Sequence, residues 1–162
     1  MTGSPVVFAS PAALLEPQHD GRAVVGTELG PSRWVEIDQQ RIQAFADATG
    51  DQQWIHTDPA RAAEGPFGVT IAHGYLTLSL LPTLTDDLVR VDGISAAINY
   101  GADRLRFVQP VVVGSRVRAV GTITSADAGS TGVKLGYRVT VEIEGSEKPA
   151  VVVDTITLFV PV

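Results

Sequence analysis

The chain has 162 residues, 44% of which are apolar, and a net charge of −6. This length supports one domain with a well-buried core and is too short for two ordinary domains. The negative charge argues against nucleic acid as the main partner, and the lack of cysteine excludes a disulfide framework, a thiolate nucleophile and a cysteine-ligated metal.

The N-terminal residues do not resemble a targeting signal. They lack the charged region that opens a secretory signal, and no run in the chain approaches the roughly 18 consecutive apolar residues of a membrane-spanning helix. We therefore expect a cytoplasmic protein with no membrane partner. Ser10 and Pro11 can begin a short helix, so we assign residues 1–20 as an N-terminal leader and residues 21–162 as the domain.

The first part of the domain is predicted to contain two short strands and a helix. Residues 23–28 and 33–37 have the composition of short strands. Asp38 can cap the N-terminus of a helix that Gly50 ends, because the apolar residues between them recur at helical spacing. This places Asp51 directly after a helix end.

Two further helices are predicted before the chain becomes rich in β-structure. Asp58 can cap a short helix that begins at Pro59. Residues 74–91 form the longest apolar helical stretch, with leucines on more than one face, which is typical of a buried helix. Pro82 removes one hydrogen bond from it and predicts a kink or break near Ser79.

The remaining sequence favours strands. Apolar and polar residues alternate in residues 133–144, as in an antiparallel sheet with one buried face. With the long apolar helix as a second layer, this pattern predicts an α+β hot-dog fold, in which an antiparallel sheet wraps around a central helix. The predicted strands are residues 95–100, 105–107, 115–127, 133–144 and 150–160.

Asp51 and His56 are candidates for a catalytic pair, because the short segment between them can bend and bring a carboxylate and an imidazole into one pocket. Each also has a structural explanation: Gly50-Asp51 is a common turn dipeptide, and His56 precedes a helix start where it could bond to backbone groups. A carboxylate beside a histidine can set the tautomer and tune the pKa of the ring for proton transfer near neutral pH. We predict acid/base chemistry on a water molecule.

Gly74 is a candidate donor to an oxyanion. Without a Cβ it lets a carbonyl approach closely, and its N–H lies at the positive end of the predicted helix. A glycine that merely begins a helix is the alternative. We favour a structural role for His73 in the turn that leads into this helix. Acid/base groups facing such a donor suggest addition or removal of water next to a carbonyl.

Two arginine pairs, Arg104 with Arg106 and Arg116 with Arg118, alternate along predicted strands, so that each pair projects from one sheet face. Solvated sheet arginines explain this spacing without any ligand. A phosphate-rich carrier would nevertheless need basic groups in this acidic protein, and arginine binds phosphate oxygens bidentately. Arg104 and Arg106 are therefore candidate phosphate contacts.

Three short motifs resemble those of the MaoC-like, or hydratase 2, family of (R)-specific enoyl-CoA hydratases. The resemblance covers residues 24–160, and the family pattern reads Gly-Asp-any-Asn-Pro-aliphatic-His. This chain departs from it with Gln53 at the asparagine position and Trp54 at the proline position. The motifs are Phe45-Ala46-Asp47-Ala48-Thr49-Gly50-Asp51, Ile55-His56 and Ala72-His73-Gly74.

The resemblance implies roles for the candidate residues. Asp51 and His56 would activate the water that adds to C3 of a trans-2-enoyl thioester, with a proton delivered to C2 on the same face. Gln53 would help to position the water or the substrate, and the Gly74 N–H would hold the thioester oxygen. The product would be an (R)-3-hydroxyacyl thioester, and no metal or redox cofactor is required.

One family residue has no counterpart here. Some members place a serine eight residues after the glycine, and this chain has Pro82 at that position. Thr77 or Ser79 are the available hydroxyl groups nearby. Asn99 and Tyr100 could line an acyl path, but a strand that ends in a turn explains them equally well.

The implied partner is an enoyl-CoA or 3-hydroxyacyl-CoA, with Arg104 and Arg106 as coenzyme A phosphate contacts, or the same acyl group on an acyl-carrier protein. A homodimer is expected, since the family generally dimerises and an exposed sheet edge needs a cover.

One rival function is that of a hot-dog acyl-CoA thioesterase, but the acidic catalyst of such an enzyme commonly lies on the central helix, and residues 74–85 contain no acid. The other is a non-catalytic acyl-thioester binding subunit, against which the presence of Asp51 and His56 argues.

Overall fold

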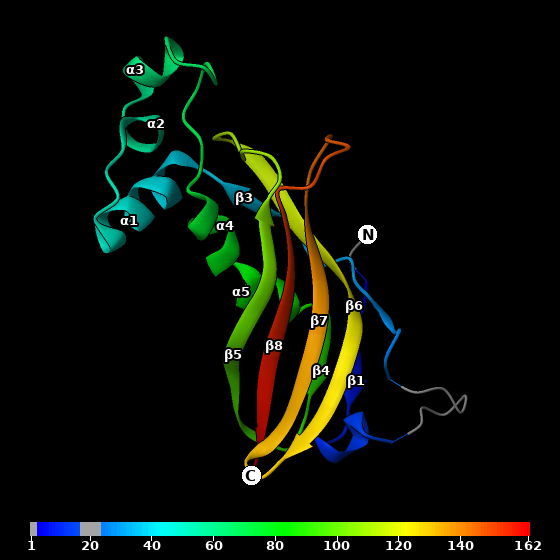
Figure 1. Ribbon diagram of the computed structural model, residues 1–162. Helices are drawn as coiled ribbons and strands as arrows, with labels where there is room; N and C mark the ends of the chain where they lie inside the picture. The colour runs from blue at the N-terminus through cyan, green and yellow to red at the C-terminus, as the bar shows by residue number, and fades with distance from the viewer. Residues whose placement is uncertain (1–2, 17–23) are drawn as a thin grey trace.

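The computed structural model describes residues 3–16 and 24–162. A long, curved sheet forms one layer, helices α4 and α5 run along it, and helices α1 to α3 gather beyond one end (Figure 1). The large sheet has six strands in the order β2-β6-β7-β8-β5, with β3 also paired to β6, and all its pairs are antiparallel. This is the α+β hot-dog architecture that the sequence predicts.

The elements have the following bounds. The strands are β1 (Val6–Phe8), β2 (Glu28–Leu29), β3 (Val35–Ile37), β4 (Val89–Val91), β5 (Ile94–Phe107), β6 (Ser115–Gly129), β7 (Gly132–Ile143) and β8 (Val151–Pro161). The helices are η1 (Ala12–Leu14), α1 (Gln39–Thr49), α2 (Trp54–Thr57), α3 (Pro59–Ala63), α4 (Gly74–Ser79) and α5 (Leu81–Thr85), of which η1 is a 3-10 helix.

The alternation predicted for residues 133–144 is confirmed in β7. Its apolar side chains point into the core, where α4 contacts β8 and α5 contacts β6. The intervening side chains are more exposed and include Arg138, which is paired with Asp154 of β8. The buried members of the alternation are Val133, Leu135, Tyr137, Val139, Val141 and Ile143.

The prediction of one helix over residues 74–91 is wrong in its length. The structure has α4 and α5 separated at Leu80, and the chain then turns and enters β4. The break next to Pro82 follows from the missing N–H, as expected. Leu80 and Leu84 are nevertheless buried, so the segment keeps its predicted place in the core. None of the helices in the described ranges is long and apolar enough to cross a bilayer.

The residues of β4, which the sequence predicts as the end of that helix, form a strand. It pairs in parallel with β1, and Phe8 and Leu14 of the N-terminal segment are buried in the core. The short N-terminal helix is the single turn η1, where the Ala13 N–H donates to Ser10 Oγ over 3.3 Å. Residues 3–16 therefore pack against the rest of the protein, while the domain boundary at residue 20, outside the described residues, stays a prediction.

Two other strand predictions need correction. The expected strand at residues 23–28 is largely a turn followed by the two-residue β2, and residue 23 lies outside the described residues. The two expected strands at residues 95–100 and 105–107 are one strand, β5, with register shifts along its pairing with β8. Residue Arg104 has a φ of 50°. The regular alternation that would place Arg104 and Arg106 on one sheet face is therefore broken there.

Candidate active site

Asp51 is held at the end of α1 by local capping. The helix begins where Asp38 accepts a hydrogen bond from the Arg41 N–H over 2.7 Å, and it ends at Gly50. Gly50 has a φ of 79°, a left-handed conformation that favours glycine, and its N–H donates to the Ala46 carbonyl. The predicted cap and stop are both confirmed, and Asp51 follows directly.

His56 lies on the short helix α2 and is buried, with 6% of its surface exposed. Its Nδ1 is 2.7 Å from the carbonyl oxygen of Ile71. Because a carbonyl only accepts, Nδ1 must carry the proton, which leaves the lone pair on Nε2. The structure thus sets the tautomer of His56 through a backbone carbonyl rather than through Asp51.

A second contact holds the backbone of His56. The side-chain Nε2 of Gln39, at the start of α1, donates to the His56 carbonyl over 2.8 Å. The Gln39 Oε1 in turn accepts from the hydroxyl of Thr70, which is buried. The Ile71 N–H donates to the carbonyl of Ile55 over 3.0 Å. The sequence pattern did not point to Gln39 or Thr70, because their contacts join segments that are far apart in the chain.

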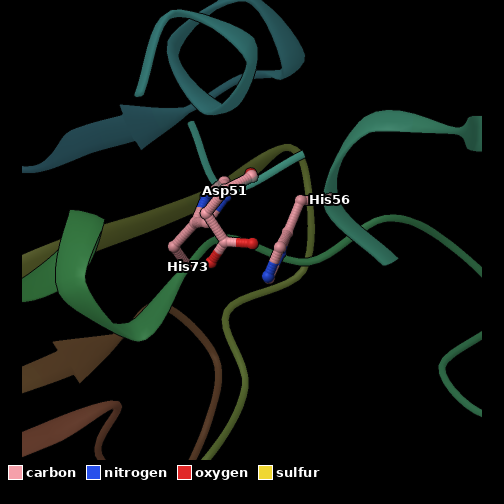
Figure 2. Close-up of side chains that lie close together, drawn as sticks. All are labelled: Asp51, His56 and His73. Atoms are coloured by element: carbon pink, nitrogen blue, oxygen red, sulfur yellow. The ribbon is translucent and has the colours of Figure 1, made fainter. Parts of the chain in front are cut away.

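Asp51, His56 and His73 come together in space. One nitrogen of each ring and a carboxylate oxygen of Asp51 all lie within 4.8 Å of one another. Figure 2 shows these side chains meeting from three separate segments. The bend predicted between Asp51 and His56 therefore brings an acid and a base to one place. The cluster also contains His73, for which the sequence favours a structural role in the turn before α4.

The same three side chains do not suit a metal ion. The rings of His56 and His73 are stacked, with centroids 3.7 Å apart and an interplanar angle of 25°. The lone pair of an imidazole nitrogen lies in the plane of its ring, so stacked rings direct their lone pairs side by side and not toward one point. A tetrahedral zinc site needs ligand lone pairs that converge.

A pocket of about 300 Å³ opens beside His56. Gly74 and Thr77 of α4 line it, and most of the remaining wall is apolar. Thr77 is the pocket hydroxyl of α4, since Ser79 donates to the Tyr75 carbonyl and Pro82 lies elsewhere. The apolar side chains of the wall are Phe67, Ile71, Ala72, Phe107, Pro110, Val111, Ala150 and Val151.

A side chain at position 74 would collide with a neighbouring residue of the same protein. A Cβ built on Gly74 would lie 2.9 to 3.1 Å from three ring atoms of Phe107, closer than real Cβ contacts normally come. Phe107 also packs edge-on against Tyr75. The Phe107 ring therefore occupies part of the space beside Gly74 that the sequence analysis expects a substrate carbonyl to use.

Asp51 and the other predicted site residues, Gln53, Arg104 and Arg106, are not among the residues that line the pocket. Gln53 is exposed, and its backbone N–H is 3.4 Å from an Asp51 carboxylate oxygen. The Arg104 side chain is 78% exposed and 3.7 Å from Asp154, and Arg106 donates to the carbonyl of Leu105. No contact in the described structure ties either arginine to the Asp51 and His56 region.

Comparison with known proteins identifies the family. A family model described as a MaoC like domain matches residues 21–145. The 3-hydroxyacyl-thioester dehydratase Z of Mycobacterium tuberculosis (strain ATCC 25618 / H37Rv) is 51% identical over 142 residues, which cover 87% of this chain and 94% of the relative. The chain belongs to the MaoC-like family. The resemblance seen in its three motifs is thereby confirmed.

Further relatives and solved structures extend this comparison. Nodulation protein N of Rhizobium leguminosarum bv. viciae is 46% identical over 137 residues, covering 83% of this chain and 85% of the relative. The solved (R)-hydratase from A. caviae involved in PHA biosynthesis aligns with a TM-score of 0.64 and 26% identity over 83% of this chain and 95% of its own. The R-hydratase PhaJ1 from Pseudomonas aeruginosa aligns with a TM-score of 0.66 and 25% identity, over 85% of this chain and 83% of its own.

Proposed function

We propose that this MaoC-like protein is an (R)-specific hydratase that adds water reversibly to a trans-2-enoyl thioester and, in reverse, dehydrates a (3R)-hydroxyacyl thioester. The hydro-lyase class follows from relatives named as a 3-hydroxyacyl-thioester dehydratase and R-hydratases. The single observation that carries the residue assignment is the placement of the Asp51 carboxylate within 4.8 Å of His56, which lines an apolar pocket.

The geometry supports a simple course for hydration. A water between the Asp51 carboxylate and His56 Nε2 gives up a proton as its oxygen bonds to C3, and a proton from the pair is returned to C2 on the same face. The Gly74 N–H, at the start of α4, donates to the thioester oxygen as enolate character develops. Thr77 is the pocket hydroxyl available for further positioning.

The rival functions receive less support. A hot-dog thioesterase would place an acid on α4 or α5, but the first acids are Asp86, at the end of α5, and Asp87, which pairs with Arg33. A binding subunit without catalysis would have no use for the exposed Asp51 carboxylate beside the lone pair of a buried His56. Both features fit a hydratase.

The thioester carrier and the assembly form the second part of the proposal. The acyl group would be carried on coenzyme A or acyl-carrier protein, with Arg104 and Arg106 as phosphate contacts that depend on a movement of exposed side chains.

The protein would act as a cytoplasmic homodimer, as the sequence analysis predicts. Edge strand β5 exposes Ile98, Tyr100 and Phe107, and a second copy would cover them. Molar mass by light scattering tests the dimer, with Ile98→Glu expected to yield monomers.

Two readings on one sample test the function. Wild-type protein mixed with crotonyl-CoA should remove the enoyl-thioester absorbance without releasing free thiol. Free thiol release would indicate a thioesterase, and neither signal with crotonyl-CoA, a longer enoyl-CoA or an enoyl-acyl-carrier protein would indicate a binding subunit. The absorbance and a thiol reagent report these events separately.

The pH dependence follows from the environment of His56. Burial lowers the pKa of its ring below the ordinary 6.5, and the neighbouring His73 acts in the same direction, while the Ile71 carbonyl and Asp51 oppose them. Nε2 accepts a proton only when the ring is neutral, so the acid limb of the kcat/KM profile should be centred below pH 6.5. A pH–rate profile with crotonyl-CoA checks this, and an acid limb centred above 6.5 would contradict it.

Gln39 should matter through the His56 backbone. Gln39→Ala removes its donor to the His56 carbonyl and leaves the Thr70 hydroxyl without its acceptor, so we expect about a tenfold fall in kcat. Gln39→Glu keeps the acceptor for Thr70 but lacks the donor, and it should be impaired as well. Steady-state kinetics of the two variants beside Gln43→Ala, an α1 control that bonds to Asp47 and Gln52, decide this. Full activity in Gln39→Ala would show that the contact is dispensable.

A further inference from the structure

His73 touches both members of the proposed catalytic pair. Its ring stacks on His56 with centroids 3.7 Å apart, and its Nε2 is 2.9 Å from the backbone carbonyl oxygen of Asp51. The residue is buried, with 3% of its surface exposed, and the Phe45 ring also packs against it at a centroid distance of 5.1 Å. No other side chain among the described residues both contacts the His56 ring and donates a hydrogen bond to Asp51.

The hydrogen bond to Asp51 fixes which nitrogen of His73 carries a proton. A carbonyl accepts, so Nε2 is the donor, and the neutral ring then has its lone pair on Nδ1. Nδ1 is buried and has no hydrogen-bond partner among the described residues. An unpaired buried polar atom destabilises a fold. A phenyl ring would fill the same space without that atom, so packing alone does not explain an imidazole here.

We propose that His73 is a positioning residue for the reaction: its ring fixes the plane of the His56 ring, and its Nε2–H fixes the peptide of Asp51. This inference rests on the proposed hydratase function, because the groups that it positions are the acid and base of that reaction. His73 touches neither water nor substrate in this role. It acts through the two residues beside it.

The position of His73 in the chain adds a third connection. It is the N-terminal cap residue of α4, directly before Gly74, and its carbonyl accepts from the Thr77 N–H. One residue therefore links the end of α1, helix α2 and the start of α4. A shift of His73 would move the Asp51 carboxylate, the His56 base and the Gly74 donor relative to one another, and errors of about 1 Å between reacting groups cost on the order of 100-fold in rate.

Two variants separate the contacts. His73→Phe keeps a ring against His56 and removes the donor to Asp51, whereas His73→Gln keeps an amide donor and removes the ring. We expect kcat for enoyl-thioester hydration to fall by about 10- to 100-fold in each. KM should change by less than about threefold, because other residues hold the substrate.

A matched control shows what a buried polar residue with a purely structural role would do. The Ser32 hydroxyl, in the loop between β2 and β3, bonds to the Arg33 carbonyl and the Ala119 N–H. Ser32→Ala should lower the melting temperature by about 2–4 °C and leave kcat of the folded protein unchanged. The proposal is overturned if kcat of both His73 variants stays within about twofold of wild type, or falls only in proportion to the unfolded fraction.

A spectroscopic measurement on wild-type protein does not depend on activity. Nitrogen NMR of the imidazole rings should show a single tautomer for each, with the proton on Nδ1 of His56 and on Nε2 of His73, and His19→Gln removes the third histidine from the spectrum. Averaging between tautomers at either ring would overturn the proposal even if the variants failed to fold. Absence of hydration by wild type, with both tautomers fixed, would instead refute only the proposed function.

Discussion

Asp51→Asn and His56→Ala should each lower kcat for hydration of crotonyl-CoA by about 10²- to 10⁴-fold, the contribution expected of a general acid or base. Asp51→Asn keeps the shape of the side chain at the end of α1 and removes its negative charge. His56→Ala removes the Nε2 lone pair. Initial rates of enoyl absorbance loss at saturating substrate measure both effects.

A neighbouring carboxylate supplies the control for these variants. Asp47 lies on α1 and accepts hydrogen bonds from Gln43 and Gln52, and it is not part of the cluster in which Asp51 meets His56 and His73. Asp47→Asn should therefore leave kcat within about twofold of wild type. If Asp51→Asn behaved like Asp47→Asn while remaining folded, Asp51 would not be part of the acid/base machinery.

Gly74→Ala is expected to have the second largest effect, because its new Cβ would meet the ring of Phe107 at 2.9 to 3.1 Å. Phe107 is 44% exposed and can turn aside, but it lines the pocket, so its displacement changes the shape of the pocket. We expect kcat/KM to fall by at least about tenfold. The backbone N–H at this position is unchanged, so a loss of activity would result from the close packing of Phe107 against position 74.

Phe107→Leu tests that explanation. A smaller side chain relieves the contact, so the double variant Gly74→Ala with Phe107→Leu should recover most of the activity that Gly74→Ala loses, measured against Phe107→Leu alone in a double-mutant cycle. A double variant as impaired as the sum of the two single variants would mean that the methyl group of alanine hinders the substrate directly.

The elements that the sequence predicted well carry their signals locally. The cap at Asp38, the stop at Gly50 and the cap at Asp58 each depend on residues within one helical turn, and all three are confirmed. The alternation along β7 is likewise visible in sequence, because every second residue faces the same side of a strand. These local features were sufficient to place Asp51 at a helix end and to predict the α+β layers.

What the sequence missed depends on contacts between distant segments. Val89 and Val91 read as a continuation of the apolar helix, but β4 is a strand because β1 lies beside it. The stacking of His73 on His56 and the packing of Phe107 on Gly74 join residues whose proximity no spacing rule reveals. The arginines illustrate the opposite error: the regular spacing of Arg104 and Arg106 assumed an unbroken strand, and β5 shifts register there.

The most direct test of the account is the configuration of the product that wild-type protein forms from crotonyl-CoA. Addition of water by Asp51 and His56 from one side of the substrate gives a single configuration. The proposed (R)-specific function predicts that it is (R)-3-hydroxybutyryl-CoA, with the carrier thiol still esterified. Chiral chromatography of the hydrolysed product reads the configuration. An (S) or racemic 3-hydroxy product, or free coenzyme A in place of the hydroxyacyl thioester, would contradict the account.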